Sequence, residues 1–246
     1  MANIRVHYID RSWTAPYHPI DIIVIGAGGT GSYMMSHLAR MQIALRELGH
    51  QGLNVKIYDS KKVNNINPVR QLFSQSDIGR YKAEVIINRI NRFYGFDWEY
   101  WNEKWVSKKY KSGSRIIISC VDTVGTRKDI FKITNDRTLN YVLDIGNGKD
   151  YGQVILSTRY SSQPKSKYIT VQVLKNMFQI HGKIKSTPNA ESCSVFDSIN
   201  SQGFMTNAIM AANGAEMLWK FFNDKVLTYH GVYVNLKTMR TTPIPI

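Results

Sequence analysis

The chain has 246 residues, of which 43% are hydrophobic and 11% aromatic, and this composition excludes an intrinsically disordered chain. The length fits one large α/β domain. No apolar run approaches the roughly 20 residues of a membrane-spanning helix, and the N-terminus lacks a signal-peptide pattern, so we expect a soluble, cytoplasmic protein. Lys and Arg number 32 against 18 Asp and Glu, a net charge of +14 that favours anionic partners such as nucleotides or nucleic acid.

The first predicted elements form a strand, a glycine-rich turn, a helix and a second strand. Residues 20–25 are a β-branched apolar run, typical of a buried parallel strand. The turn at 26–31 follows, and apolar residues spaced three and four apart over 34–48 predict a helix. Residues 53–58 form the second strand. This order is typical of a nucleotide-binding unit.

Strands and helices continue to alternate further along the chain, which predicts a Rossmann-like, doubly wound and mostly parallel α/β sheet with a C-terminal extension. We expect a nucleotide-binding adenylation half at 1–150. An extension with a crossover loop and the last helix follows at 151–246, and the two make one compact domain. The remaining predicted elements are helices at 80–93, near 127–134 and at 204–222, strands at 115–120, 141–145, 153–158 and 168–174, and a polar loop at 187–201.

The glycine turn carries the pattern G-x-G-x-x-G, in which Gly26, Gly28 and Gly31 are in register, and we count Gly29 with them as a nucleotide-binding residue. Glycines let the backbone approach a phosphate, and the helix N-terminus offers N–H groups that have no partner within the helix. Asp59 ends the second strand, where a carboxylate would accept hydrogen bonds from ribose hydroxyls. It follows Gly31 by 28 residues against the roughly 20 expected, so an ordinary turn residue is the alternative.

The segment at 59–73 reads Asp-Ser-Lys-Lys-Val-Asn-Asn-Ile-Asn-Pro-Val-Arg-Gln-Leu-Phe. It resembles the ThiF/MoeB family, the relatives of ubiquitin-activating enzyme, whose pattern is D-x-D-x-V-x-x-x-N-x-x-R-Q. The resemblance covers 20–160 well and 198–222 loosely. Its matching positions are Asp59, Val63, Asn67, Arg70 and Gln71, then Lys82, and Asp122 with Arg127. The chain further resembles the ThiF-like proteins of the PRTRC plasmid cassette, in blocks at 38–41, 44–50, 89–95 and 152–154.

The resemblance implies ATP and Mg²⁺ as cofactors and adenylation of the C-terminal carboxylate of a small ubiquitin-like protein. Attack of a carboxylate on a phosphate joins two anions, so the site must neutralise charge. Arg70 can fork two phosphate oxygens, Lys82 can place a point charge near them, and Asn67 can donate from its amide. Asp122 would hold Mg²⁺, which binds through one or two carboxylates plus phosphate oxygens. The resemblance also implies a homodimer and a conjugating-enzyme-like partner.

Each of these residues has a simpler interpretation when it is considered alone. Arg70 and Lys82 can be surface cations, and Asp122 can cap the helix that follows it. We expect Arg127 to support the site or pair with a carboxylate rather than touch ATP. The simpler interpretations together require several coincidences in the order of the family pattern.

The two cysteines are too few for a disulfide scaffold or a four-cysteine zinc site, and no structural zinc is expected. Cys193 lies where relatives form a thioester with their substrate, and an ordinary loop thiol is the alternative. Cys120 ends a predicted strand and should pack in the core. Lys61 replaces the second acid of D-x-D, and an N-terminal arginine that relatives borrow from a dimer partner would be Arg5 or Arg11.

Two other functions are compatible with parts of the sequence. The glycine turn with Asp59 alone would suit an NAD-dependent oxidoreductase. The net charge of +14 and the plasmid-cassette resemblance would suit a nucleic-acid-binding maintenance adaptor, although no helix-turn-helix or basic aromatic platform is evident. A hydride-transfer enzyme has no use for the set formed by Arg70, Lys82 and Asp122, so adenylation is favoured and nucleic-acid binding ranks last.

Overall fold

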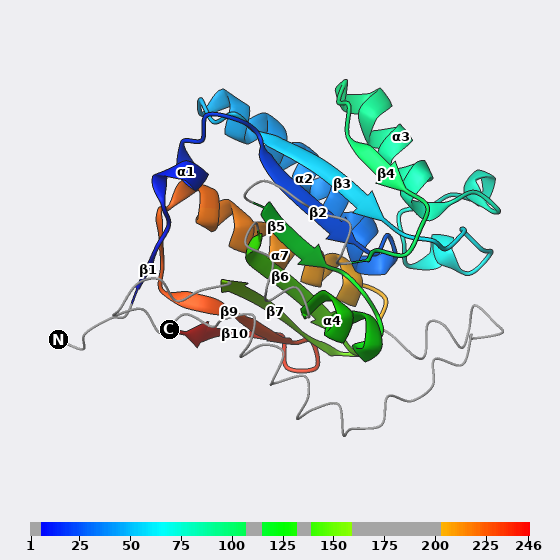
Figure 1. Ribbon diagram of the computed structural model, residues 1–246. Coiled ribbons are helices and arrows are strands. Elements are labelled where there is room, and N and C mark those ends of the chain that lie inside the picture. The colour runs from blue at the N-terminus through cyan, green and yellow to red at the C-terminus, as the bar shows by residue number, and fades with distance from the viewer. Residues whose placement is uncertain (1–5, 107–114, 132–138, 159–202) are drawn as a thin grey trace.

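A computed structural model describes residues 6–106, 115–131, 139–158 and 203–246. Its centre is an eight-stranded sheet with the order β10-β9-β7-β6-β5-β2-β3-β4 (Figure 1). Five strands are parallel: β2 (Ile20–Ile25), β3 (Leu53–Tyr58), β4 (Glu99–Trp101), β5 (Arg115–Ser119) and β6 (Leu139–Asn147). Three antiparallel strands extend it: β7 (Tyr151–Thr158), β9 (Tyr229–Asn235) and β10 (Arg240–Pro245). This arrangement confirms the predicted fold class.

Helices cover both faces of the sheet, which explains why the central parallel strands β2 and β5 are mostly apolar. In β2, Ile22 and Val24 contribute to the larger core, whereas Ile23 and Ile25 contribute to a smaller one on the other face. The larger core includes residues of α2 (Gly29–Glu47), α3 (Lys82–Tyr94) and α7 (Thr206–Asn223). The smaller core includes residues of α4 (Val124–Phe131).

A second, two-stranded sheet joins an N-terminal segment to the segment that follows α7: β1 (His7–Tyr8) pairs with β8 (Val226–Leu227), and the short helix α1 (Arg11–Thr14) follows β1. Trp13 of α1 accepts a hydrogen bond from His50 through its carbonyl oxygen at 2.9 Å, so α1 lies at the C-terminal end of α2. Among the helices in the described parts of the chain, none is long and apolar enough to cross a bilayer.

The strands predicted at 20–25 and 53–58 have the observed bounds, and the helix predicted at 204–222 is α7, shifted by a residue or two. The helix predicted near 127–134 begins earlier, at Val124. Its predicted end, the strand at 168–174 and the loop at 187–201 lie outside the described residues. One sheet contains strands from both predicted halves, and the boundary at residue 150 stays a prediction.

The strand order places the candidate site. After β2 the chain passes through α2 to β3 on one side, while β5 lies on the other side of β2. The three strands end in register, since Ile25 is opposite both Tyr58 and Ser119. Their arrowheads point to the same edge of the sheet (Figure 1). In open α/β sheets, ligands bind in the crevice at such a reversal of strand order.

Candidate active site

The glycine turn follows β2 and is held between the ends of β3 and β5, the two strands that flank β2. Gly26 has φ +97°, a conformation that residues with a side chain rarely adopt, and its N–H donates to the carbonyl oxygen of Tyr58 at 2.9 Å. A Cβ on Gly26 would lie 2.7 Å from the carbonyl oxygen of Cys120, which follows β5. Gly28 caps α2 without a side chain, and a Cβ there would meet nothing within 4 Å. The turn is therefore tight against the sheet at Gly26 and open at Gly28.

Asp59 organises this turn. One of its carboxylate oxygens accepts from the N–H of Ala27 at 2.7 Å, and the other accepts from the N–H of Lys61 at 2.7 Å. Each carboxylate oxygen can accept a second hydrogen bond, so binding a ribose hydroxyl stays a prediction for Asp59. The observed contacts give Asp59 the structural task of a turn residue, which was the alternative left open by its long spacing from Gly31.

Asn67 and Arg70 lie in a loop built around a 3-10 turn at Asn67–Val69. Asn67 is 8% exposed, and its Oδ1 accepts from the N–H of Asn64 at 3.0 Å. The amide oxygen is therefore used within the loop, and the amide nitrogen is the end that can donate to a ligand. Arg70 ends the turn and donates its N–H to the carbonyl oxygen of Asn67 at 3.2 Å. Burial lowers the pKa of the Arg70 guanidinium.

Lys82 is the first residue of α3 and is 6% exposed. Its ammonium donates to Oε1 of Gln71 at 3.1 Å. Burial lowers the pKa of Lys82, an effect that the positive charge of Lys61 adds to and the negative charges of Asp59 and Asp122 oppose. The buried position and these electrostatic interactions distinguish Lys82 from an ordinary surface cation.

Asp122 lies beyond the end of β5, and its exposed carboxylate pairs with Lys61. Oδ2 of Asp122 is 3.5 Å from Nζ of Lys61. The start of α4 is capped by the next residue, because Oγ1 of Thr123 accepts from the N–H of Thr126 at 3.3 Å. Asp122 therefore does not make this capping hydrogen bond, and its side chain is directed to Lys61, two residues after Asp59.

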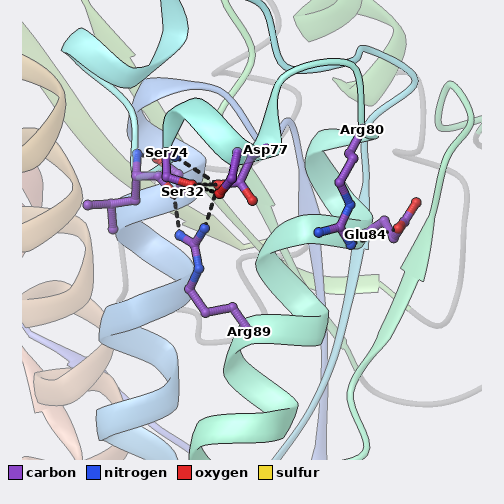
Figure 2. A network of polar contacts seen from close by, with 8 residues as sticks. Ser32, Ser74, Asp77, Arg80, Glu84 and Arg89 are labelled. Atoms are coloured by element: carbon purple, nitrogen blue, oxygen red, sulfur yellow. Dashed lines mark hydrogen bonds and ion pairs between the residues drawn. The ribbon is translucent and has the colours of Figure 1, made fainter.

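A network of polar contacts holds the segment after Arg70 against α2 and α3. Arg89 of α3 donates to the carbonyl oxygen of Leu72 at 2.6 Å and to Oδ2 of Asp77 at 2.7 Å. That carboxylate also accepts from the N–H and the hydroxyl of Ser74, both at 2.8 Å. The hydroxyl oxygen of Ser32 in α2 accepts from the N–H of Leu72 at 3.1 Å. Figure 2 shows these side chains converging between the two helices.

The same network connects this segment to the glycine turn, because the hydroxyl of Ser32 donates to the carbonyl oxygen of Gly29 at 2.9 Å. None of these positioning residues was predicted from the sequence. Ser74 and Asp77 form a capping box around a short 3-10 turn, and that local pattern of a serine followed three residues later by an acid was the available signal.

Arg127 supports the site from α4 by pairing with a carboxylate. Its Nε lies 3.2 Å from Oδ1 of Asp144, and it donates to the carbonyl oxygens of Val121 and Ile145, each at 3.0 Å. Burial raises the pKa of Asp144, and the charge of Arg127 opposes that rise. Asp144 was missed, although an acid within a predicted buried strand is itself a signal.

The start of α7 packs against the glycine turn, and this contact was also not predicted. Oδ1 of Asn207 accepts from Thr30 at 3.2 Å and from Nδ2 of Asn147, at the end of β6, at 2.9 Å. A Cβ on Gly29 would collide with the side chain of Asn207. The last helix thus helps to shape the turn.

The remaining predicted residues divide into those that the structure describes and those outside it. Cys120 packs against the larger core, as predicted, and burial raises the pKa of its thiol, which disfavours a nucleophilic thiolate. Cys193 and Arg5 lie outside the described residues. Arg11 belongs to α1, at the opposite end of α2 from the turn, and the 19 residues of α2 span about 28 Å.

The described residues contain no group of three or more His, Cys, Asp or Glu that could hold a metal ion. Asp122, beyond the end of β5, offers an exposed carboxylate. A single carboxylate fits Mg²⁺ that arrives with phosphate oxygens as its other ligands, and it does not fit a cation held by protein groups alone.

Together, the strand order, the tight glycine turn and the neighbouring buried cation define a Rossmann-like nucleotide site. The chain belongs to the ThiF family, whose profile matches residues 17–242. No curated protein is similar enough to match.

Solved structures share the fold at low sequence identity. PaaA is 14% identical with a TM-score of 0.59, and the similarity covers 92% of this chain and 64% of PaaA. The E. coli MccB structure with ATP is 15% identical with a TM-score of 0.58 and the same coverage. The E. coli tRNA N6-threonylcarbamoyladenosine dehydratase TcdA is 17% identical with a TM-score of 0.54, covering 84% of this chain and 87% of TcdA. This chain thus spans under two-thirds of the length of PaaA and MccB.

Proposed function

We propose that the protein is an ATP-dependent adenylyltransferase that activates the C-terminal carboxylate of a small ubiquitin-like protein. The observation that carries the proposal is the grouping of charges beside the glycine turn. Lys82 is buried there, and its pKa responds to Asp59, Lys61 and Asp122. A buried ammonium costs free energy, so an anionic ligand at this position would explain its presence.

In the proposed reaction, a carboxylate oxygen of the protein substrate attacks the α-phosphorus of ATP. The bond from that phosphorus to the bridging oxygen of pyrophosphate breaks, and the acyl adenylate and pyrophosphate result. Lys82 and Arg70 neutralise charge that is brought together at the phosphates, and Asn67 donates from its amide nitrogen. Asp122 would hold Mg²⁺, which when bound supplies further neutralisation of the pyrophosphate leaving group.

Two of the structural neighbours, MccB and TcdA, bear on the proposed chemistry. MccB has been solved with ATP and with MccA, and TcdA is a tRNA dehydratase. The choice of a ubiquitin-like substrate, the grouping with PRTRC cassette proteins and the cytoplasmic location rest on this chain's own sequence. A homodimer, a conjugating-enzyme-like partner and a thioester on Cys193 belong to the same proposal. Arg11, at the far end of α2, would serve only the site of another protomer.

Exchange of labelled pyrophosphate into ATP, with candidate ubiquitin-like proteins, tests the proposal. We expect exchange that depends on a partner with a free C-terminal carboxylate. Asp122→Ala should abolish exchange and leave the fold intact, because its carboxylate is exposed. Asp97→Ala is the matched control, an exposed acid before β4 and therefore at the other edge of the sheet.

Normal exchange by Asp122→Ala would refute the metal role of Asp122. Binding of NADH in place of ATP, with no exchange for any partner, would refute adenylation and favour the oxidoreductase.

For the later step, Cys193→Ala should spare exchange and remove any thiol-sensitive adduct with the partner, detected by intact mass. An adduct that persists would exclude Cys193 as the acceptor.

A further inference from the structure

Lys61 stands where the family pattern has an acid, and the structure gives this departure a definite neighbour. The backbone of Lys61 is fixed on both sides: its N–H donates to Asp59 at 2.7 Å, and its carbonyl oxygen accepts from the N–H of Lys82 at 3.0 Å. The side chain extends from the end of β3 to Asp122 beyond β5, with Nζ 3.5 Å from Oδ2. The two ends of this contact lie on opposite sides of β2 and its glycine turn.

The ion pair between Lys61 and Asp122 can open easily. The side chain of Lys61 is 67% exposed and that of Asp122 is 54% exposed, and ion pairs between exposed groups are weak. Because the backbone of Lys61 is held, the pair can open by rotation of one flexible side chain without movement of the sheet. Burial is the main cause of the lowered pKa of Lys82, and the charge of Lys61 adds to it, as expected for a second cation close to the first.

We propose that Lys61 is an exchangeable counter-ion: it neutralises Asp122 in the empty site, turns to the phosphates of ATP when no metal is present, and is displaced from Asp122 when Mg²⁺ binds. The proposal rests on the ATP site of the proposed function and adds a residue that the family pattern does not supply. A cation at position 61 has two consequences. It competes with Mg²⁺ for the Asp122 carboxylate, and it strengthens binding of a triphosphate that carries no metal.

These two consequences have opposite signs, which makes them testable with one substitution. The experiment measures the Kd of a fluorescent, non-hydrolysable ATP analogue for the full chain, first in EDTA and then in a Mg²⁺ titration. Lys61→Met keeps the length of the side chain and removes its charge. We expect it to weaken binding in EDTA by about three- to tenfold. It should also lower the Mg²⁺ concentration for half-maximal binding by about two- to fivefold.

Lys62→Met is the matched control, since Lys62 is the adjacent exposed lysine and its ammonium lies 5.0 Å from the centroid of the Tyr81 ring. It should change neither quantity. Equal weakening of ATP-analogue binding by Lys61→Met with and without Mg²⁺ would overturn the counter-ion proposal, because the effect of a purely structural residue would not depend on the metal. Binding like that of wild type in both conditions would also overturn it and leave the ATP site standing. Failure of the wild-type chain to bind the analogue in either condition would overturn the proposed function together with this inference.

Discussion

The glycine turn allows a prediction in which stability and binding separate. Gly26→Ala would place a Cβ 2.7 Å from the carbonyl oxygen of Cys120 and 3.1 Å from its carbonyl carbon, at φ +97°. Both contacts are to backbone, which cannot move aside by rotating a side chain. The unfavourable φ costs about 1–2 kcal/mol and overpacking about 1–3 kcal/mol. We expect the free energy of unfolding to fall by about 2–5 kcal/mol.

Gly28→Ala should behave in the opposite way. A Cβ at Gly28 meets nothing within 4 Å, and the loss of a favourable helix cap is offset by the reduced freedom of the unfolded chain. We expect the free energy of unfolding to change by less than about 1 kcal/mol. The added methyl would occupy the side of the turn where a phosphate approaches, so ATP should bind about tenfold more weakly or worse, as for a lost hydrogen bond to a charged group.

Urea denaturation followed by circular dichroism measures the first quantity, and titration with the ATP analogue measures the second. Wild-type stability in Gly26→Ala would show that the turn does not have the described backbone. Unchanged ATP affinity in a folded Gly28→Ala would show that no phosphate approaches the turn there. Either result would refute the corresponding step of the reasoning.

Two further predictions concern buried titratable groups. Arg127→Met leaves the carboxylate of Asp144 buried without its ion pair and should lower the free energy of unfolding by about 3–5 kcal/mol at pH 7. The loss should shrink as the pH falls and the carboxyl group, whose pKa burial raises, becomes protonated; an equal loss at pH 7 and pH 4 in urea melts would contradict this. Burial lowers the pKa of both His7 and His230 to about 4. In the unfolded chain these histidines bind protons below about pH 6.5, whereas in the folded protein they do not until about pH 4. Their contribution to the free energy of unfolding should therefore be constant above pH 6.5. It should decrease as the pH falls from 6.5 to 4, by up to about 3 kcal/mol for each histidine. A flat stability profile over this range would show that the two rings are accessible to protons in the folded state.

The local elements of the nucleotide unit follow from short-range sequence patterns. The β-branched run at Ile20–Ile25, the glycines after it and the apolar spacing of α2 each act over a few residues, and the structure has these elements as predicted. The last helix was also predicted, because its apolar face repeats over many turns. The hairpin of β9 and β10 was not predicted, since Pro243 and Pro245 interrupt the strand pattern and their position at the sheet edge accommodates them.

What tertiary structure alone decided is which distant side chains meet. Lys61 and Asp122 follow different strands, and they are neighbours only because β3 and β5 flank β2 and end in register with it. Asp144 meets Arg127 for a similar reason: the carboxylate and the helix that carries the arginine are brought together by the packing of α4 on the sheet. Sequence spacing reports the conformation of consecutive residues, whereas contacts between strand ends depend on the order of strands, which no local pattern encodes.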